Sequence, residues 1–180
     1  MKRLFVFCVV LTVLALTGAA AQQTAAELTF SFTRQSGFAT NQFAVWVENS
    51  QGVYIKTLYA TRFTADGGWK KRPSSIPLWV KQSVVSGMTK AQVDSLTGAT
   101  PRNGTLTYRW DGTDSRGAAL PAGNYVLFLT GTLRNDTQVI YSAPIRLGQG
   151  PAEAKVSVEY VGKPGAESAM IGDVTARVLR

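Results

Sequence analysis

The chain has 180 residues with 19 Lys and Arg, 11 Asp and Glu, one cysteine, no histidine and a formal net charge of +8. The lack of histidine excludes Ser-His-Asp and Cys-His catalysis, histidine-ligated haem, and zinc or copper sites that use imidazole. The length and the 45% hydrophobic content suit one domain with a packed core.

The first 21 residues have the order of a secretory signal peptide. Met1-Lys2-Arg3 is basic, residues 4–16 are apolar, and residues 17–21 are small. The apolar run is too short to span a bilayer. We therefore expect cleavage after Ala21 and a single mature domain over residues 22–180, without a transmembrane segment, in the periplasm or outside the cell.

Cleavage would remove Cys8, so the mature protein would have no disulfide and no thiolate chemistry. Subtracting Lys2 and Arg3 leaves 17 − 11 = +6 charges, part of them in Lys70-Lys71-Arg72. Outside the cytoplasm, such a surface favours anionic lipid, cell wall or an acidic protein as partner, and we expect no nucleic acid. The triplet is also consistent with a solvated loop.

Alternating apolar residues predict strands at 27–34, 42–48 and 53–63. The second strand has apolar side chains on both faces, and the third is predicted to place Thr57 and Tyr59 on the same face. Asn49-Ser50-Gln51-Gly52 between them predicts a hairpin turn.

Residues 64–80 read as irregular, with a helical turn opening at Pro77. Trp69 and Trp79 are expected to cover the open end of the core, with ligand binding as the alternative. A short helix is predicted at 90–96, capped by Thr89 and ended by Gly98. Pro101 prevents its continuation, and Thr100 is expected at the tip of an exposed turn.

Further strands are predicted at 105–110, 124–133, 138–147, 154–161 and 173–179. About eight strands and one short helix indicate an all-β fold, an Ig-like antiparallel β-sandwich. Trp110 and Tyr125 lie at the edges of two strands joined by an Asp/Gly turn, so we expect both in the core.

The block from Trp110-Asp111-Gly112 to Pro121-Ala122-Gly123-Asn124-Tyr125 resembles the Ig-like module of flagellar hook-capping proteins. In that module a strand ends in Trp-Asp-Gly, and Pro-x-Gly-x-Tyr opens the next strand. The resemblance implies a fold and says almost nothing about function.

A wider pattern resembles the predicted periplasmic proteins grouped as domain of unknown function 2271. The matching residues are 43–48, 56–58, Trp69, Leu78-Trp79, Ser83, 94–100 and 110–125. The resemblance implies that the protein occurs together with extracytoplasmic flavin-transfer and PepSY-type redox proteins. The family itself has no settled activity.

In that context, residues 94–100, Asp-Ser-Leu-Thr-Gly-Ala-Thr, match Asp-x-x-Ser/Thr-Gly-Ala-Ser/Thr at every fixed position. The resemblance implies that a membrane flavin transferase attaches FMN through its phosphate to Thr100, and the motif positions Asp94, Thr97, Gly98 and Ala99 complete the candidate site. Arg102, Lys90 and the basic triplet are candidate partners for the phosphate. The structural alternative is that Asp94 supports the helix, Gly98 ends it, and Thr100-Pro101 is only a turn.

Three functions are compatible with these patterns. The first is an exported β-sandwich protein of an extracytoplasmic flavin redox system, which carries covalent FMN on Thr100 or acts as an accessory to envelope redox proteins that carry it. The alternative is a non-enzymatic Ig-like module for binding or assembly in the cell envelope. A hydrolase using Asp111 and Asp114 is third, because an Asp/Gly turn explains both residues better. We assign no catalytic residue and no metal ligand.

Overall fold

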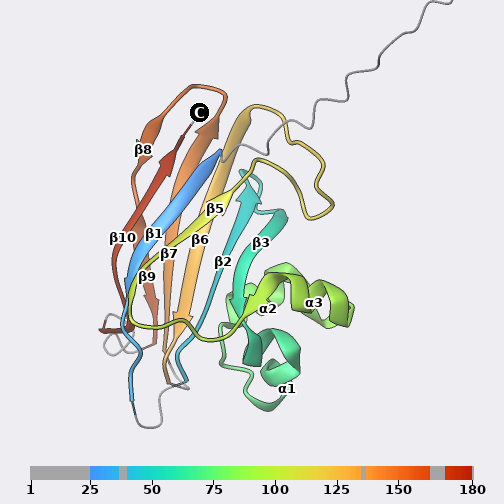
Figure 1. The fold of residues 1–180 in the computed structure, drawn as a ribbon, viewed down its shortest axis with the longest axis vertical. Helices are drawn as coiled ribbons and strands as arrows, with labels where there is room; N and C mark the ends of the chain where they lie inside the picture. The colour runs from blue at the N-terminus through green and yellow to red at the C-terminus, as the bar shows by residue number, and fades with distance from the viewer. Residues whose placement is uncertain (1–24, 37–39, 135–136, 163–168, 180) are drawn as a thin grey trace, which may run out of the picture.

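The computed structural model of the protein describes residues 25–36, 40–134, 137–162 and 169–179. The expected signal peptide and its cleavage site after Ala21 lie outside these residues. The described residues form two packed β-sheets with short helices beside one of them (Figure 1). The all-β sandwich expected from the sequence is therefore confirmed.

The sheets differ in size. The four-stranded sheet has the order β5 (Gly104–Trp110), β1 (Ala26–Phe32), β10 (Ile171–Val178) and β8 (Ala152–Ala154). The six-stranded sheet has the order β4 (Thr97–Gly98), β3 (Tyr54–Thr61), β2 (Gln42–Asn49), β6 (Gly123–Thr132), β7 (Gln138–Leu147) and β9 (Ser157–Val161). Neighbouring strands are antiparallel except β3 and β4, which are parallel.

The main core lies between the two sheets. Alternate residues of β1 point inward, and Phe30 packs edge-on against Phe43 of β2 with ring centroids 5.5 Å apart. Trp110 is fully buried and Tyr125 is 6% exposed, so both residues are in the core as expected. Their rings meet edge-on at 5.0 Å, which joins the end of β5 to the start of β6.

A second core lies on the other face of the six-stranded sheet, under a layer of short helices. This layer consists of η1 (Thr64–Gly68), α1 (Trp69–Lys71), α2 (Pro77–Ser83), η2 (Val85–Gly87) and α3 (Lys90–Leu96). The helix predicted at 90–96 is α3, and the helical turn predicted at Pro77 opens α2, but the helices over 64–71 and 85–87 were not predicted. Because β2 has apolar residues on both faces, its outer face needs a cover, and Ile76, Trp79, Val85 and Val93 of the helical layer supply it over Trp46.

Neither tryptophan of this layer covers the open end of the sandwich. Trp79 is fully buried in the second core, where its indole N–H donates to Oγ1 of Thr57 at 3.0 Å. Trp69 is partly buried against the same cluster. Both therefore hold the helices to the sheet.

Irregular pairing between β2 and β3 changes which side chains share a face. Val45 pairs with Tyr59, but the next residue, Trp46, pairs with Thr57, so one residue of β3 is left over. Thr57 consequently faces the helical layer, whereas Tyr59 packs against the core between the sheets. The prediction that both lie on the same face was wrong, because strict alternation does not continue through a bulge.

Residues 154–161 do not form one strand. Ala154 ends β8 in the four-stranded sheet, and Ser157 begins β9 in the six-stranded sheet. The two intervening residues take the chain from one sheet to the other. The hairpin predicted at Asn49–Gly52 is present, with Gly52 at φ 74° and the Asn49 side chain accepting from the backbone N–H of Gln51 and Val53.

Candidate functional site

Thr89 caps the start of helix α3, as predicted. The Thr89 hydroxyl accepts a hydrogen bond from the backbone N–H of Gln92 at 3.3 Å, and the Gln92 side chain accepts from the backbone N–H of Thr89 at 2.8 Å. This reciprocal capping box satisfies two N–H groups that the helix leaves without partners. It fixes the start of the helix that carries Asp94.

The end of α3 differs from the prediction, because Gly98 does not terminate the helix. Leu96 is its last residue, Thr97 is extended with φ −109° and ψ 154°, and Thr97–Gly98 form β4 beside β3. The chain becomes extended directly after the helix because Thr97 and Gly98 pair with the backbone of β3 at the sheet edge. The Asp-x-x-Thr-Gly-Ala-Thr segment therefore joins a helix to a sheet edge.

Gly98 has a different role, which is close packing against a tyrosine ring. A Cβ added at Gly98 would lie 3.0 Å from Cε2 of Tyr59, so a larger residue would displace the ring. The Tyr59 hydroxyl donates to the carbonyl of Ala99 at 3.0 Å. Tyr59 thus fixes the backbone of the motif, a contact that the sequence analysis missed.

Thr100 follows in a segment without regular structure that leads to β5 in the other sheet (Figure 1). Ala99 is exposed and Thr100 is only partly buried, so the exposed tip is Ala99 and not Thr100 as expected. Among the described residues, no hydrogen bond is found to the Thr100 hydroxyl, and its oxygen is not buried. The hydroxyl is therefore not committed to a structural partner in this part of the chain.

The acidic residue of the motif is held by two cations. Asp94 accepts a hydrogen bond from Arg62 Nη2 at 2.5 Å and forms a longer ion pair with Lys90 at 3.8 Å. Arg62 comes directly after β3 and was not among the candidates. The Oγ1 atom of Thr97 is buried without a hydrogen-bond partner within the described residues. No hydrogen bond or ion pair there links Arg102 or the basic triplet to the motif.

Beside the motif, aromatic rings line the edge where β3 and β5 face each other. The Tyr59 ring lies 5.0 Å from Phe43 and 5.0 Å from Tyr108, measured between centroids. Both tyrosines are partly buried. Burial raises the pKa of Tyr59 to about 12, and burial together with the neighbouring Tyr59 raises the pKa of Tyr108.

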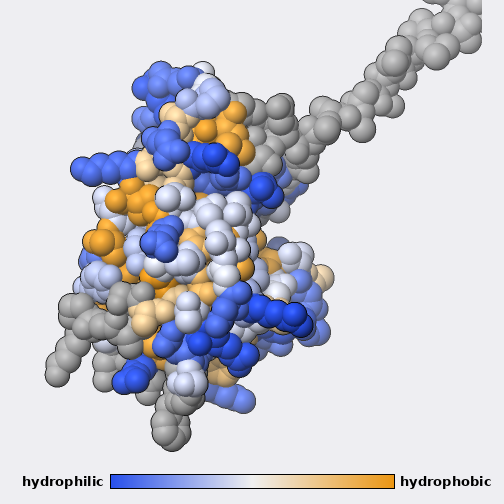
Figure 2. Space-filling view, turned by 60° about the vertical axis from the view of Figure 1, so that its left-hand side comes forward, coloured by the Kyte–Doolittle hydropathy of each residue, from blue (hydrophilic) through white to orange (hydrophobic). Residues whose placement is uncertain are grey.

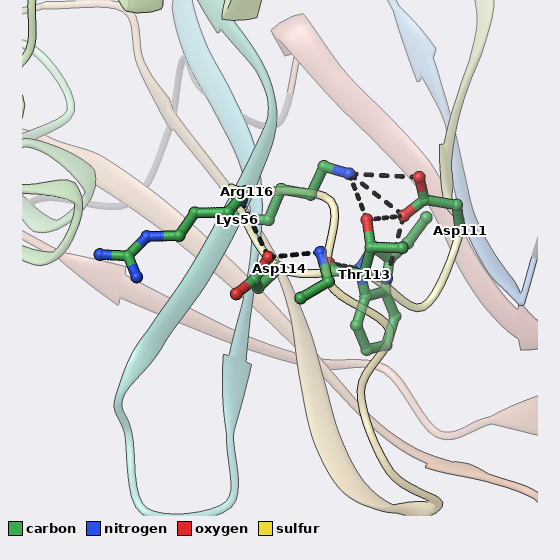
Figure 3. Close-up of polar contacts among 7 residues, drawn as sticks. Lys56, Asp111, Thr113, Asp114 and Arg116 are labelled. Atoms are coloured by element: carbon green, nitrogen blue, oxygen red, sulfur yellow. Dashed lines mark hydrogen bonds and ion pairs between the residues drawn. The ribbon is translucent and has the colours of Figure 1, made fainter.

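The Trp-Asp-Gly loop is held by a separate polar network (Figure 3). The ammonium group of Lys56 lies 3.1 and 3.2 Å from the two carboxylate oxygens of Asp111 and donates to Oγ1 of Thr113 at 2.8 Å. Burial would raise the pKa of Asp111, but hydrogen bonds from Thr113 and Lys56 outweigh it and leave the pKa below its usual value.

Asp114 closes the same loop by accepting from the backbone N–H groups of Arg116 at 2.8 Å and Ala118 at 2.9 Å. Those two N–H groups lower its pKa, with Ala118 contributing most. A carboxyl pair that works as acid and base needs one member with a raised pKa, which stays protonated. Here the pKa values of both Asp111 and Asp114 are lowered. The geometry therefore favours the turn over the hydrolase. In the described ranges, no three Asp, Glu, Cys or His side chains cluster as metal ligands.

The comparison with protein families matches residues 23–163 to the family described as predicted periplasmic protein, DUF2271. No match is found among curated proteins or among solved structures, and the likeness of 110–125 to the hook-capping module has no support beyond the segment itself. In the part of the chain that the structure describes, no helix has both the length and the apolar character of a membrane span. The family match covers both the 94–100 motif and the Trp110–Tyr125 block, and its description agrees with the periplasmic location expected from the sequence. The chain belongs to the DUF2271 family of predicted periplasmic proteins.

Proposed function

We propose that this periplasmic protein carries FMN in a phosphoester on Thr100 and serves an extracytoplasmic flavin redox system. One observation carries the proposal: the complete motif ends at a sheet edge where Ala99 is exposed and the Thr100 hydroxyl has no partner among the described residues. A modifying enzyme must reach the acceptor oxygen, and loops at the edge of a rigid scaffold permit this.

The residues around Thr100 are compatible with an FMN attached through a phosphoester. Gly98 and Ala99 carry almost no side-chain bulk next to Thr100, and a Cβ at Gly98 would lie 3.0 Å from Cε2 of Tyr59. The hydroxyl of Thr97, buried and unpartnered within the described residues, is a further group that a structural turn does not explain. Arg102 is exposed two residues after Thr100, where its guanidinium can balance phosphate charge.

In the modification step, the Thr100 oxygen forms a bond to the FMN phosphorus. The bond between that phosphorus and the leaving group of the flavin donor breaks, and the hydroxyl proton passes to a base of the transferase. Once attached, FMN supplies the electron transfer. The protein holds the phosphoester on the sheet edge, and the partly buried rings of Tyr59 and Tyr108 provide aromatic surface nearby.

The test is co-expression of the exported protein with a membrane flavin transferase. We expect a fluorescent band after denaturation and an FMN-sized mass addition on the peptide containing Thr100. Thr100→Ala should abolish both and change the free energy of unfolding by less than about 1 kcal/mol, because the side chain is only partly buried. Thr105→Ala, at an exposed threonine of β5, is the matched control and should be flavinylated like the wild type.

An unmodified wild-type protein, beside a positive control that the same transferase flavinylates, would disprove the proposal. Modification that persists in Thr100→Ala would show that the acceptor is another residue.

A second candidate function, a binding or assembly module, is favoured by β9. Every residue of this strand is exposed, including Val158 at 51%, Tyr160 at 37% and Val161 at 48%. Among the described strands, it is the last of its sheet and pairs only with β7. Figure 2 shows apolar surface on the side of the molecule where β8 and β9 lie. An apolar edge with no further strand beside it among the described residues suits the addition of a strand from another protein.

A photo-crosslinking residue at position 158 tests this second function in the periplasm. We expect one discrete cross-linked partner, and none from position 107, an exposed position on β5 at the edge of the other sheet. Tyr160→Lys places a charge on the same edge, so it should lower the cross-linking yield from position 158. Equal cross-linking patterns from both positions would rule out β9 as a docking edge.

A further inference from the structure

A groove of about 440 Å³ lies along the first half of β3, under the helical layer. Tyr54 and Thr57 of β3 form one side, and Ser83 and Val84, where α2 ends, form another. Because β4 runs parallel to β3 from Ala60 onward, the chain carries Thr100 away from this end of the strand. Ser95 and Leu96 of the 94–100 segment belong to the lining, but Thr100 does not, so ligand binding in the groove does not require a flavin on Thr100.

Ser83 is the first sign that the groove holds a ligand. The residue is 5% exposed, it lines the groove, and its Oγ has no hydrogen-bond partner within the described residues. A buried hydroxyl without a partner costs free energy, and native proteins usually avoid it. A ligand that donates to or accepts from this oxygen would remove the cost.

Val84 is the second sign. Its backbone is left-handed, with φ 50° and ψ 40°, a conformation that a β-branched residue rarely adopts. Its side chain is 64% exposed, so burial of the valine does not compensate for the strain. Strain of this kind collects at binding sites, where it places a side chain that function requires. Here it holds an apolar group beside Ser83.

The chemistry of the remaining lining selects the class of ligand. Among the described residues, Lys56 is the only charged one that lines the groove, and Asp111 neutralises it at 3.1 Å. Hydroxyls of Ser95 and Ser115 and the carboxamide of Gln92 belong to the same lining. Uncharged donors and acceptors together with apolar groups match a sugar ring, which has hydroxyls at its rim and C–H groups on its faces.

We infer that the groove between β3 and the helical layer binds an uncharged saccharide, with the Ser83 hydroxyl as a hydrogen-bond partner. The partly buried ring of Tyr54, whose hydroxyl bonds to Thr57 at 2.8 Å, provides aromatic surface for the C–H face of the sugar. The volume accommodates a ligand of one to a few rings, within the usual range of small-molecule sites.

The experiment is titration calorimetry of the purified mature protein with maltotriose, cellotriose and the trimer of N-acetylglucosamine, and with trigalacturonate as a charged probe. We expect saturable binding of at least one neutral trisaccharide and weaker binding of trigalacturonate. Ser83→Ala should weaken the binding about tenfold, the effect of one hydrogen bond. It removes an unpartnered hydroxyl, so the fold should be retained, which circular dichroism checks. Ser157→Ala, on exposed β9, is the control and should bind like the wild type.

Each other result counts against the inference. If none of the three neutral trisaccharides binds, or if trigalacturonate binds more tightly than all of them, the assigned class is wrong. If Ser83→Ala binds like the wild type, the saccharide does not occupy this groove.

Discussion

Replacing Trp110 by alanine is expected to lower the free energy of unfolding by about 3–5 kcal/mol, as for other large buried aromatic residues. The side chain is fully buried, packs edge-on against Tyr125 at 5.0 Å, and donates its indole N–H to the carbonyl of Thr113 at 2.8 Å. Alanine would leave a cavity between the sheets and a buried carbonyl without its donor. Urea unfolding followed by circular dichroism measures the loss.

One variant separates the loss of ring packing from the loss of the hydrogen bond, and a second compares Trp110 with a less buried tryptophan. Trp110→Phe keeps most of the ring but removes the indole N–H, so we expect a loss of about 1–3 kcal/mol. Trp69→Ala, at a tryptophan that is only partly buried, should cost less than Trp110→Ala. A loss below about 1 kcal/mol for Trp110→Ala would mean that this residue lies on the surface and that the sandwich is packed differently.

A second large effect is expected in alkaline solution. Burial raises the pKa of Tyr59 from 10.0 to about 12, so the folded protein holds this proton more tightly than the unfolded chain. Stability from this difference is fully present below about pH 10 and is lost as the pH rises toward about pH 12. Because one pKa unit corresponds to about 1.4 kcal/mol, and Tyr59 is partly exposed, we expect a loss on the order of 2 kcal/mol from this residue.

Tyr108 adds to the same loss, since burial and the neighbouring Tyr59 also raise its pKa. The measurement is the urea midpoint as a function of pH, together with the phenolate absorbance. The double variant Tyr59→Phe, Tyr108→Phe lacks both ionisable groups, so its midpoint should fall less steeply above about pH 10 than that of the wild type. Parallel pH profiles for the two proteins would show that these tyrosines do not control alkaline stability.

Much of the sandwich could be predicted from local patterns. Alternation identified β1, β2, β5, β6 and β7 within a residue or two at each end, because each of these strands has a consistent apolar face. Only the helix at 90–96 and the turn at Pro77 were predicted from the helical layer, because its apolar residues, among them Ile76 and Trp79, are spread over short turns that carry no long helical period. Only the doubly buried strand β2 indicated that something must cover the outer face of its sheet.

The candidate site shows where local patterns stop being informative. Residues 94–100 were identified as a candidate flavin site through the family resemblance, and the helix that precedes Gly98 was predicted to be capped by Thr89. The partners that fix this segment, Tyr59 of β3 and Arg62 just after it, come more than thirty positions earlier in the chain. No periodicity connects them to Asp94 or Gly98. Ser83 was likewise only a position in a family pattern until the fold placed it in a groove, without a partner among the described residues.

The pairing of the first described strand with the last sets the order in which the protein can fold. β1 lies between β5 and β10, and Ala26 is in register with Val178. An exported chain presents its N-terminal end first, so β1 must wait for nearly the whole polypeptide before its sheet can close. Such long-range pairing slows folding. The six-stranded sheet needs only residues 42–161, so it can assemble first and serve as the template on which the terminal strands dock.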